Sequence, residues 1–383
     1  MSHDACVNSK NHKIICKFIM KFFKKFYLNP INIKIDNNLL EPKIINSTTK
    51  NLQLFVLEIR RLYDFLMCYP IFCESSFKQV FQVIHGYIFL NDIPFIHTFD
   101  IIDDQLIHLK YIEIKTLRII QSANRPLEIT FIDDLMIKHQ YLYKRGVNLM
   151  KDVCIVNIFK IFSNYLNVRI IEYKIIVFSK YDGLIEMVPN ITFDIQFKRF
   201  ISNLLDLKDY DISKNEIFIH TLSFYTLSTF LCGIGDRTDG NVCFTENAIF
   251  HIDFSYIFGS KPKTNFLTPD DTFFFPSFVK TLLSTKPIFA SKVLRTMKNM
   301  YKIMRLNSKS ILDKIETLFQ KQVFFDIDSI SAMNYLREKF KLNLEDNQAN
   351  LFIENLFYNE VRTLNSYITS GLNTAGRVFR SFL

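Results

Sequence analysis

The sequence predicts an α+β protein in which β-rich segments precede a helical C-terminal region. Short apolar segments bounded by turn residues occur at 119–131, 141–144 and 173–178, which is typical of strands. Beyond Pro276, apolar residues recur at the spacing of amphipathic helices. The 383 residues are 49% apolar, with 40 Phe and no Trp, so the chain can bury a large core in about two or three domains.

The first part of the chain is expected to be helical. Leu52–Cys68 has a strong helical pattern, and a second apolar segment, Phe77–Leu90, follows Pro70. Upstream, Lys13–Leu28 places Phe residues at helical spacing among Lys residues, so it either packs on the rest of the protein or lies on an anionic membrane. We expect residues 1–114 to form a short helical extension.

Strands and helices are expected to alternate in the middle of the chain. Residues 119–131 are predicted as strand, turn and strand, and Tyr141–Lys144 as a further strand that ends in a lysine. A helix is expected over Val153–Leu166, with Asp152 at its start, where a carboxylate suits the positive end of the helix dipole. Two β segments and an apolar helix follow at 173–178, 183–188 and Ile217–Cys232.

The C-terminal region is expected to hold five helices and a short basic and aromatic tail. The tail comprises residues 371–383. The helices are predicted at Phe278–Leu283, Phe289–Met304, Ser310–Phe319, Ile330–Phe340 and Glu345–Ile368.

The most distinctive polar spacing follows the apolar helix. Asp236 is followed five residues later by Asn241, and Asp253 lies in an apolar Ile-Asp-Phe context. Val242–Phe244 and Ala248–Ile252 are predicted to pair as a hairpin, which returns Asn241 and Asp253 to one edge. Phosphoryl transfer to a hydroxyl requires two carboxylates and an amide at such a spacing. Asp236 can orient the hydroxyl and accept its proton, while Asn241 and Asp253 are hard ligands for Mg²⁺ on ATP phosphates.

This motif resembles the catalytic segment of the phosphoinositide 3-kinase and 4-kinase superfamily. Gly233–Arg237 and Asn241 are followed by His251–Phe254, whereas ordinary protein kinases place His-Arg before the catalytic Asp. The continuation Tyr256–Lys263 is similar to the activation loop of class III phosphoinositide 3-kinases, which phosphorylate phosphatidylinositol. The resemblance implies a bilobal kinase-like fold, with a β-rich N-lobe and hinge at 115–188 and a helical C-lobe at 189–383.

The resemblance also implies roles for residues outside the core motif. Arg237 joins the catalytic set, and Lys261 and Lys263 lie where the activation loop would meet the lipid headgroup, although they could equally be solvated loop charges. Ser122 and Lys144 would bind the phosphates of the nucleotide. Asp152 and Tyr173 would shape the inner pocket. Glu186 and Val188 would present main-chain groups to the adenine.

Several positions depart from the family pattern. Thr238 stands where the family has His, and because Thr accepts no proton near pH 7, the change costs about 10²–10⁴ in rate if that His is the base. Ser255 replaces the Gly of Asp-Phe-Gly, which narrows the freedom of the backbone. The segment after Lys144 keeps some family residues and loses others. Those retained are Gly146, Leu149 and Asp152, and those that differ are Val147, Asn148, Met150 and Lys151.

Charge and cysteine content restrict the class of partner and compartment. A net charge of +9 favours anionic lipid, nucleotide or nucleic acid, but the Phe residues lie in apolar runs rather than among Arg on strands, so no nucleic-acid partner is expected. The seven Cys form no Cys-x-x-Cys pair, so we expect the protein to lie in a reducing compartment and to have no structural zinc site. No uncharged apolar run reaches about 18 residues and no signal peptide is evident, so we expect a cytoplasmic protein, peripheral on endosomal or other intracellular membranes.

The expected function is phosphorylation of phosphatidylinositol in a membrane surface, at the 3-hydroxyl, with ATP and Mg²⁺ or Mn²⁺. A regulatory protein subunit would be a further partner. A phosphatidylinositol 4-kinase is an alternative because it shares the core motif. A catalytically weak or inactive kinase-like scaffold is the other, because of Thr238 and Ser255.

Overall fold

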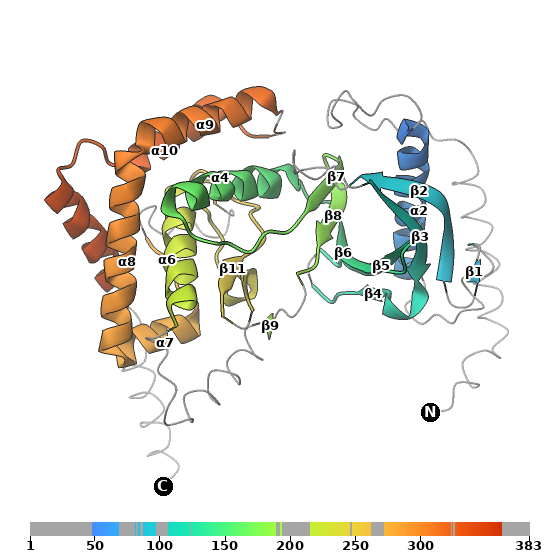
Figure 1. The fold of residues 1–383 in the computed structure, drawn as a ribbon, viewed down its shortest axis with the longest axis horizontal. Helices are drawn as coiled ribbons and strands as arrows, with labels where there is room; N and C mark the ends of the chain where they lie inside the picture. Colours follow the sequence, from blue (N-terminus) through green and yellow to red (C-terminus); the bar gives the residue numbers. More distant parts are fainter. Residues whose placement is uncertain are drawn as a thin grey trace, which may run out of the picture. The chain divides into compact units, whose positions relative to one another are not determined.

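Strands dominate the first part of the chain and helices the second, which confirms the α+β class (Figure 1). The chain divides into two compact units, Met1–Tyr143 and Lys144–Leu383. The structure, a computed structural model, describes the following residues: 48–68, 81, 83–84, 87–96, 106–122, 124–188, 192–193, 215–245, 247–261, 272–322, 324 and 326–361.

The first unit contains an antiparallel sheet and one long helix in its described part. Strands β1, β2, β3, β5 and β6 follow one another in the sheet, and β4 pairs with β5. The last strand, β6, runs across the boundary into the second unit at Lys144. The elements are α2 (Thr48–Cys68), β1 (Val83–Ile84), β2 (Tyr87–Ile96), β3 (Leu106–Glu113), η3 (Ile114–Thr116), β4 (Arg118–Ile119), β5 (Leu127–Asp133) and β6 (Lys138–Arg145).

Helix α2 is stabilised because its apolar face packs against the sheet. Phe55, Ile59 and Leu62 share this face and are fully buried. The ring of Phe55 lies 5.5 Å from that of Phe131 in β5. Burying each such side chain stabilises the fold by about 1.5–3 kcal/mol, so the helix and the sheet depend on each other.

The expectation of a helical extension over residues 1–114 is right for α2 and wrong for the described residues 83–84, 87–96 and 106–113. There the chain forms β1, β2 and β3, because β3 finds a partner in β5, which lies outside that segment. The strand, turn and strand expected at 119–131 are confirmed by the pairing of β4 with β5. The domain boundaries themselves stay a prediction.

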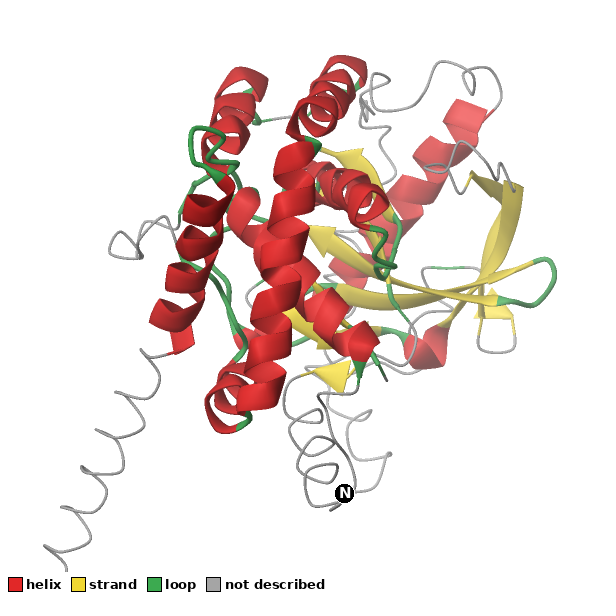
Figure 2. Ribbon diagram, turned by 60° about the vertical axis from the view of Figure 1, so that its left-hand side comes forward, coloured by secondary structure: helices red, strands yellow, loops and turns green. Residues whose placement is uncertain are grey.

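The second unit is mostly helical (Figure 2). Its strands form the hairpin β7–β8 and a small sheet in the order β11, β10, β9. The elements are α4 (Met150–Leu166), β7 (Ile175–Ser179), β8 (Asp182–Glu186), β9 (Thr192–Phe193), α6 (Glu216–Leu231), η5 (Asp239–Asn241), β10 (Val242–Phe244), β11 (Ile249–His251), α7 (Ser277–Thr285), α8 (Pro287–Leu306), α9 (Ser308–Lys321), α10 (Ser329–Lys339) and a helix over residues 346–361.

Helix α6 is the core of this unit and leads into the candidate site. Thirteen of its 16 residues are buried, as expected for a helix that is apolar on all sides. Asn215 caps its start by accepting the Phe218 N–H at 3.0 Å. The helix packs against α8, α4 and β11, and its C-terminal end leads into the loop that carries Asp236.

The helices predicted after Pro276 are confirmed as α7 to α10, and the last one is described as far as residue 361. The expected helix at Lys13–Leu28, the end of the final helix and the tail at 371–383 lie outside the described residues. None of the helices in the described ranges has the length and apolar composition needed to cross a bilayer.

Candidate active site

The hairpin β10–β11 brings Asn241 and Asp253 to the same end of a small sheet, as the sequence predicts. Val242 pairs with His251, and the Ile252 N–H donates to the Asn241 carbonyl at 3.0 Å. Asn241 therefore directly precedes one strand, and Asp253 follows the other.

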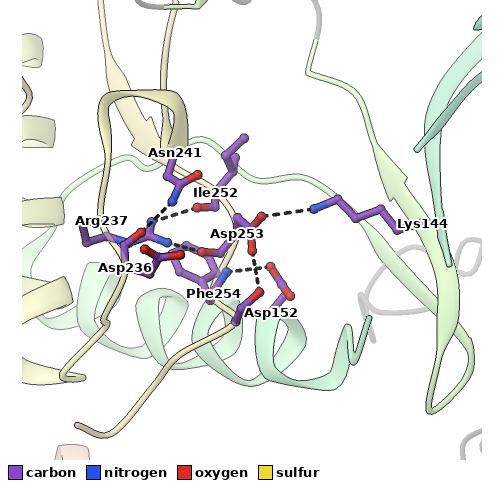
Figure 3. A network of polar contacts seen from close by, with 9 residues as sticks. Lys144, Asp152, Asp236, Arg237, Asn241, Ile252, Asp253 and Phe254 are labelled. Carbon is purple, nitrogen blue, oxygen red and sulfur yellow. Dashed lines mark hydrogen bonds and ion pairs between the residues drawn. The ribbon is translucent and has the colours of Figure 1, made fainter. Parts of the chain in front are cut away.

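Asn241 is fixed by the loop that precedes it, residues 232–238, which is the predicted catalytic loop. Its amide Nδ2 donates to the main-chain oxygen of Asp236 at 2.8 Å (Figure 3). The amide oxygen Oδ1 is thereby left as the group that can accept or ligate. Asp236 adopts a left-handed conformation with φ of 54° and is exposed, so its carboxylate is open to an incoming molecule.

Arg237 ties the catalytic loop to the segment that carries Asp253. Its guanidinium donates to the main-chain oxygens of Gly235 at 3.3 Å, of Ile252 at 2.8 Å and of Asp253. Burial lowers the pKa of Arg237 to about 10, which still leaves it charged at neutral pH. The planar fork thus serves the main chain rather than a substrate group.

Lys144 faces Asp253 from the end of β6. Its Nζ lies 3.7 Å from Asp253 Oδ2, and its side chain is only 14% exposed. Burial alone raises the pKa of the Asp253 carboxyl, but the neighbouring Lys144, Ser255 and Arg237 outweigh it and hold that pKa below its ordinary value. Asp253 is therefore ionised at neutral pH.

Asp152 lies in the first turn of α4 and is almost completely buried. Its Oδ1 accepts the Phe254 N–H at 3.0 Å. Burial raises the pKa of Asp152 to about 6, and the charge of Asp253 adds to this effect while that of Lys144 opposes it. The carboxyl thus fixes the main chain next to Asp253 instead of facing solvent.

The oxygen donors of this site fit Mg²⁺ bound together with phosphates. Asp253 supplies carboxylate oxygens and Asn241 an amide oxygen, which are hard ligands. The described ranges contain no group of three or more His, Cys, Asp or Glu side chains that could hold a metal ion. Mg²⁺ commonly takes about one or two protein oxygens and completes its shell with substrate phosphates and water.

The expected adenine-binding segment is the end of β8. Glu186 is the last residue of the strand, and its main-chain N–H donates to the Lys174 carbonyl at 2.8 Å. This leaves the Glu186 carbonyl and the half-buried Val188 as the hinge groups to consider. Tyr173 is buried, lies 6.2 Å from the Phe250 ring, and lines a small cavity together with His251.

Among the other residues singled out in the sequence, Thr238 touches the cluster, because its main-chain oxygen accepts the Asn241 N–H at 3.0 Å. Ser122 belongs to the first unit, where it is exposed in the turn between β4 and β5. Lys261 is half-buried at the end of a described range, and Lys263 lies outside the described residues. Thr238 is exposed in the catalytic loop. The roles assigned to these residues stay predictions.

Two residues that were noted only as departures from the family pattern touch the site. The Ser255 hydroxyl donates to Asp253 Oδ1 at 2.7 Å, and Lys151 Nζ donates to the Ser255 carbonyl at 3.0 Å. The signal that could have found them is that both differ from the family pattern, Lys151 in the segment after Lys144 and Ser255 in the segment after Asp253. The ring of His251 stacks on that of Tyr225, with 5.3 Å between the ring centroids, and neither of its ring nitrogens has a hydrogen-bond partner in the described part of the chain.

Three main-chain hydrogen bonds join the catalytic loop to the segment after Asp253. Gly235 N–H donates to Tyr256, Phe258 N–H to Cys232, and Gly259 N–H to Gly233, at 2.9, 2.7 and 3.0 Å. Tyr335 of α10 packs against both segments. A Cβ on Gly233 would lie 2.2 Å from its hydroxyl, and a Cβ on Gly259 would lie 2.7 Å from its ring. Both glycines have positive φ, so each is needed for conformation and for space.

Comparison with known proteins finds phosphatidylinositol 3-kinases. Phosphatidylinositol 3-kinase VPS34 of Saccharomyces cerevisiae is 25% identical over 284 residues, 70% of this chain and 32% of that protein. The probable phosphatidylinositol 3-kinase VPS34 homolog of Encephalitozoon cuniculi is 29% identical over 163 residues, 40% of this chain and 36% of that protein. Phosphatidylinositol 3-kinase VPS34 of Arabidopsis thaliana is 24% identical over 263 residues, 64% and 32% of the two chains.

The chain spans about a third of the length of these relatives. No family model matches it. The similarities confirm the resemblance to the catalytic region of the phosphoinositide 3-kinase and 4-kinase superfamily, and to its class III members.

Proposed function

We propose that the chain is a lipid kinase that transfers the γ-phosphoryl group of ATP to phosphatidylinositol, at the 3-hydroxyl of the inositol ring. The observation that carries this proposal is the hairpin that sets Asn241 beside Asp253, with Lys144 Nζ 3.7 Å from the Asp253 carboxylate. A fixed cation beside a pair of hard ligands is what a nucleotide with its metal requires. The similar proteins named above are all phosphatidylinositol 3-kinases, which supports the choice of lipid.

In this proposal each residue of the cluster has one task. Asp236 orients the inositol hydroxyl and takes its proton as the hydroxyl oxygen bonds to the γ-phosphorus and the bridge to the β-phosphate breaks, releasing ADP. Lys144 would bind the phosphates, and Asn241 and Asp253 would hold Mg²⁺. When bound, the metal neutralises charge on the phosphates. Arg237 keeps the two loops in register through its carbonyl contacts.

The remaining assignments concern the nucleotide pocket. The main chain of Glu186 and Val188 would bind the adenine, while Tyr173 and Asp152 shape the inner end of the slot. Ser122 would reach the phosphates from the turn between β4 and β5. These residues would place the N-lobe and hinge at 115–188 and the C-lobe at 189–383.

Membrane contact completes the proposal. Lys261 and Lys263 suit the single phosphodiester of phosphatidylinositol, and the net charge of +9 favours an anionic lipid surface. We place the chain at the cytoplasmic face of an intracellular membrane, with a regulatory subunit as a further partner.

The test is phosphate transfer from labelled ATP to phosphatidylinositol vesicles by the full chain. Asp253→Ala should abolish incorporation, whereas Asp313→Ala, an exposed acid on α9, should leave it unchanged. Chromatographic separation of the product isomers distinguishes the 3-phosphate from the 4-phosphate. Equal incorporation by wild type and Asp253→Ala would refute the assigned site, and a 4-phosphate product would refute the assigned hydroxyl.

Thr238 decides between a kinase and a silent scaffold. If Asp236 suffices as the base, the wild type turns over and Thr238→His gains little. If the missing His is the base, the wild type is nearly silent, and Thr238→His should raise the rate by about 10²-fold or more. A silent wild type that Thr238→His does not restore would favour a scaffold without kinase activity.

A further inference from the structure

We propose that Ser255 is a positioning residue for the metal ligand Asp253, held in place by Lys151 of helix α4. The inference rests on the metal role proposed above for Asp253. Ser255 Oγ donates to Asp253 Oδ1 at 2.7 Å, while Oδ2 faces Lys144 Nζ at 3.7 Å. The two carboxylate oxygens are thus in different surroundings, and the hydroxyl fixes which one can turn toward a cation.

The main chain around Asp253 is fixed from two sides. On one side, Arg237 donates to the carbonyls of Ile252 and Asp253. On the other side, the first turn of α4 supplies Asp152, which accepts the Phe254 N–H at 3.0 Å, and Lys151, which donates to the Ser255 carbonyl at 3.0 Å. Every residue from 252 to 255 therefore has a main-chain contact with a charged side chain.

Serine can occupy position 255 without strain. Asp253 has a positive φ of 62°, and Ser255 is not among the described residues with a positive φ. The freedom that glycine would provide is therefore not needed for the conformation observed. Serine adds a hydroxyl that bonds to the ligand, whereas the carbonyl that accepts from Lys151 belongs to the main chain and would be present with glycine as well.

The physical effect is preorganisation of the ligand. A carboxylate whose Oδ1 is already bonded has fewer orientations to lose when a cation binds to it. Partners of this kind, which contact a ligand but not the metal, commonly change metal affinity by about 10–100-fold when they are removed. Ser255→Ala should weaken metal binding by a factor in that range.

The experiment measures Mn²⁺ binding by electron paramagnetic resonance on the full chain with a non-hydrolysable ATP analogue. Ser255→Ala should weaken Mn²⁺ about 10–100-fold, Ser255→Thr, which keeps the hydroxyl, should restore it, and Ser284→Ala on α7 should match wild type. Melting curves for all variants establish that each is folded. Wild-type affinity in Ser255→Ala, while Asp253→Ala loses the ion, overturns this inference alone; unchanged affinity in Asp253→Ala overturns the metal role as well.

A second measurement tests the part played by Lys151. Lys151→Gln removes the ammonium group that binds the Ser255 carbonyl, so amide hydrogen exchange at 253–256 should become faster. Exchange in α9 serves as the internal control, since the described helix lies outside these contacts. Unchanged exchange at 253–256 would show that Lys151 does not hold this segment.

Discussion

Replacing Asp152 with Asn tests whether a buried carboxyl beside the site destabilises the protein at neutral pH. Asp152 is 4% exposed, and Asn can keep an oxygen directed at the Phe254 N–H. The side chain has nearly the same shape, so the substitution removes the charge and little else.

The magnitude follows from the pKa of Asp152, which burial raises from 3.8 to about 6. A carboxyl whose folded pKa is raised contributes stability that is fully present below its unfolded pKa and is lost as the pH rises through the folded one. The shift corresponds to about 3 kcal/mol of unfolding free energy, of which about 2 kcal/mol is lost between about pH 4.5 and pH 8. D152N carries no such proton, so its stability relative to wild type should rise by that amount over the same interval.

The assay is urea unfolding followed by circular dichroism at 222 nm, which reports mainly the helices of Lys144–Leu383. Wild type and D152N are compared at several pH values without nucleotide or divalent metal, because a bound cation would change the charge next to Asp253. A difference between the two proteins that is independent of pH, or that shrinks as the pH rises, would refute the reasoning.

Three further predictions concern the support of the site. Arg237→Lys loses the fork that binds two carbonyls, so phosphate transfer to phosphatidylinositol should fall by about 10²-fold. Gly233→Ala forces a Cβ against Tyr335 at a φ of 53°, and urea unfolding should show a loss of about 1–3 kcal/mol. Asn215→Ala removes the cap of α6 and should cost about 1 kcal/mol, whereas Asn215→Gly should cost about a few tenths. If one of these variants kept the wild-type rate of phosphate transfer or the wild-type stability, the role assigned to the contact that it removes would be wrong.

Features that depend on a few neighbouring residues were predictable from the sequence. The hairpin at Val242–Phe244 could be inferred because two short apolar segments flank a polar turn, and pairing then fixes where Asn241 and Asp253 lie. Lys144 is near the end of β6, as its place after Tyr141–Tyr143 predicts. Helix α6 follows the apolar run at 217–232 to within a residue at each end.

Features that depend on distant partners were not predictable. β3 is a strand because β5 lies beside it, and no local pattern in residues 83–113 specifies that pairing. Lys151 reaches Ser255 across 104 residues of sequence, through the direction in which α4 happens to present its first turn. His251 stacks on Tyr225 because packing around α6 places an aromatic ring next to the imidazole.

The shared hydrogen bonds between residues 232–235 and 256–259 restrict how this protein could be re-engineered. These bonds join main-chain groups, so a chimera that borrows only the segment after Asp253 keeps them only if the borrowed backbone follows the same path beside residues 232–235. Tyr335 enforces the match, because its ring leaves room for no side chain at Gly233 or Gly259. A graft in this region would have to transfer both loops and the α10 tyrosine as one block.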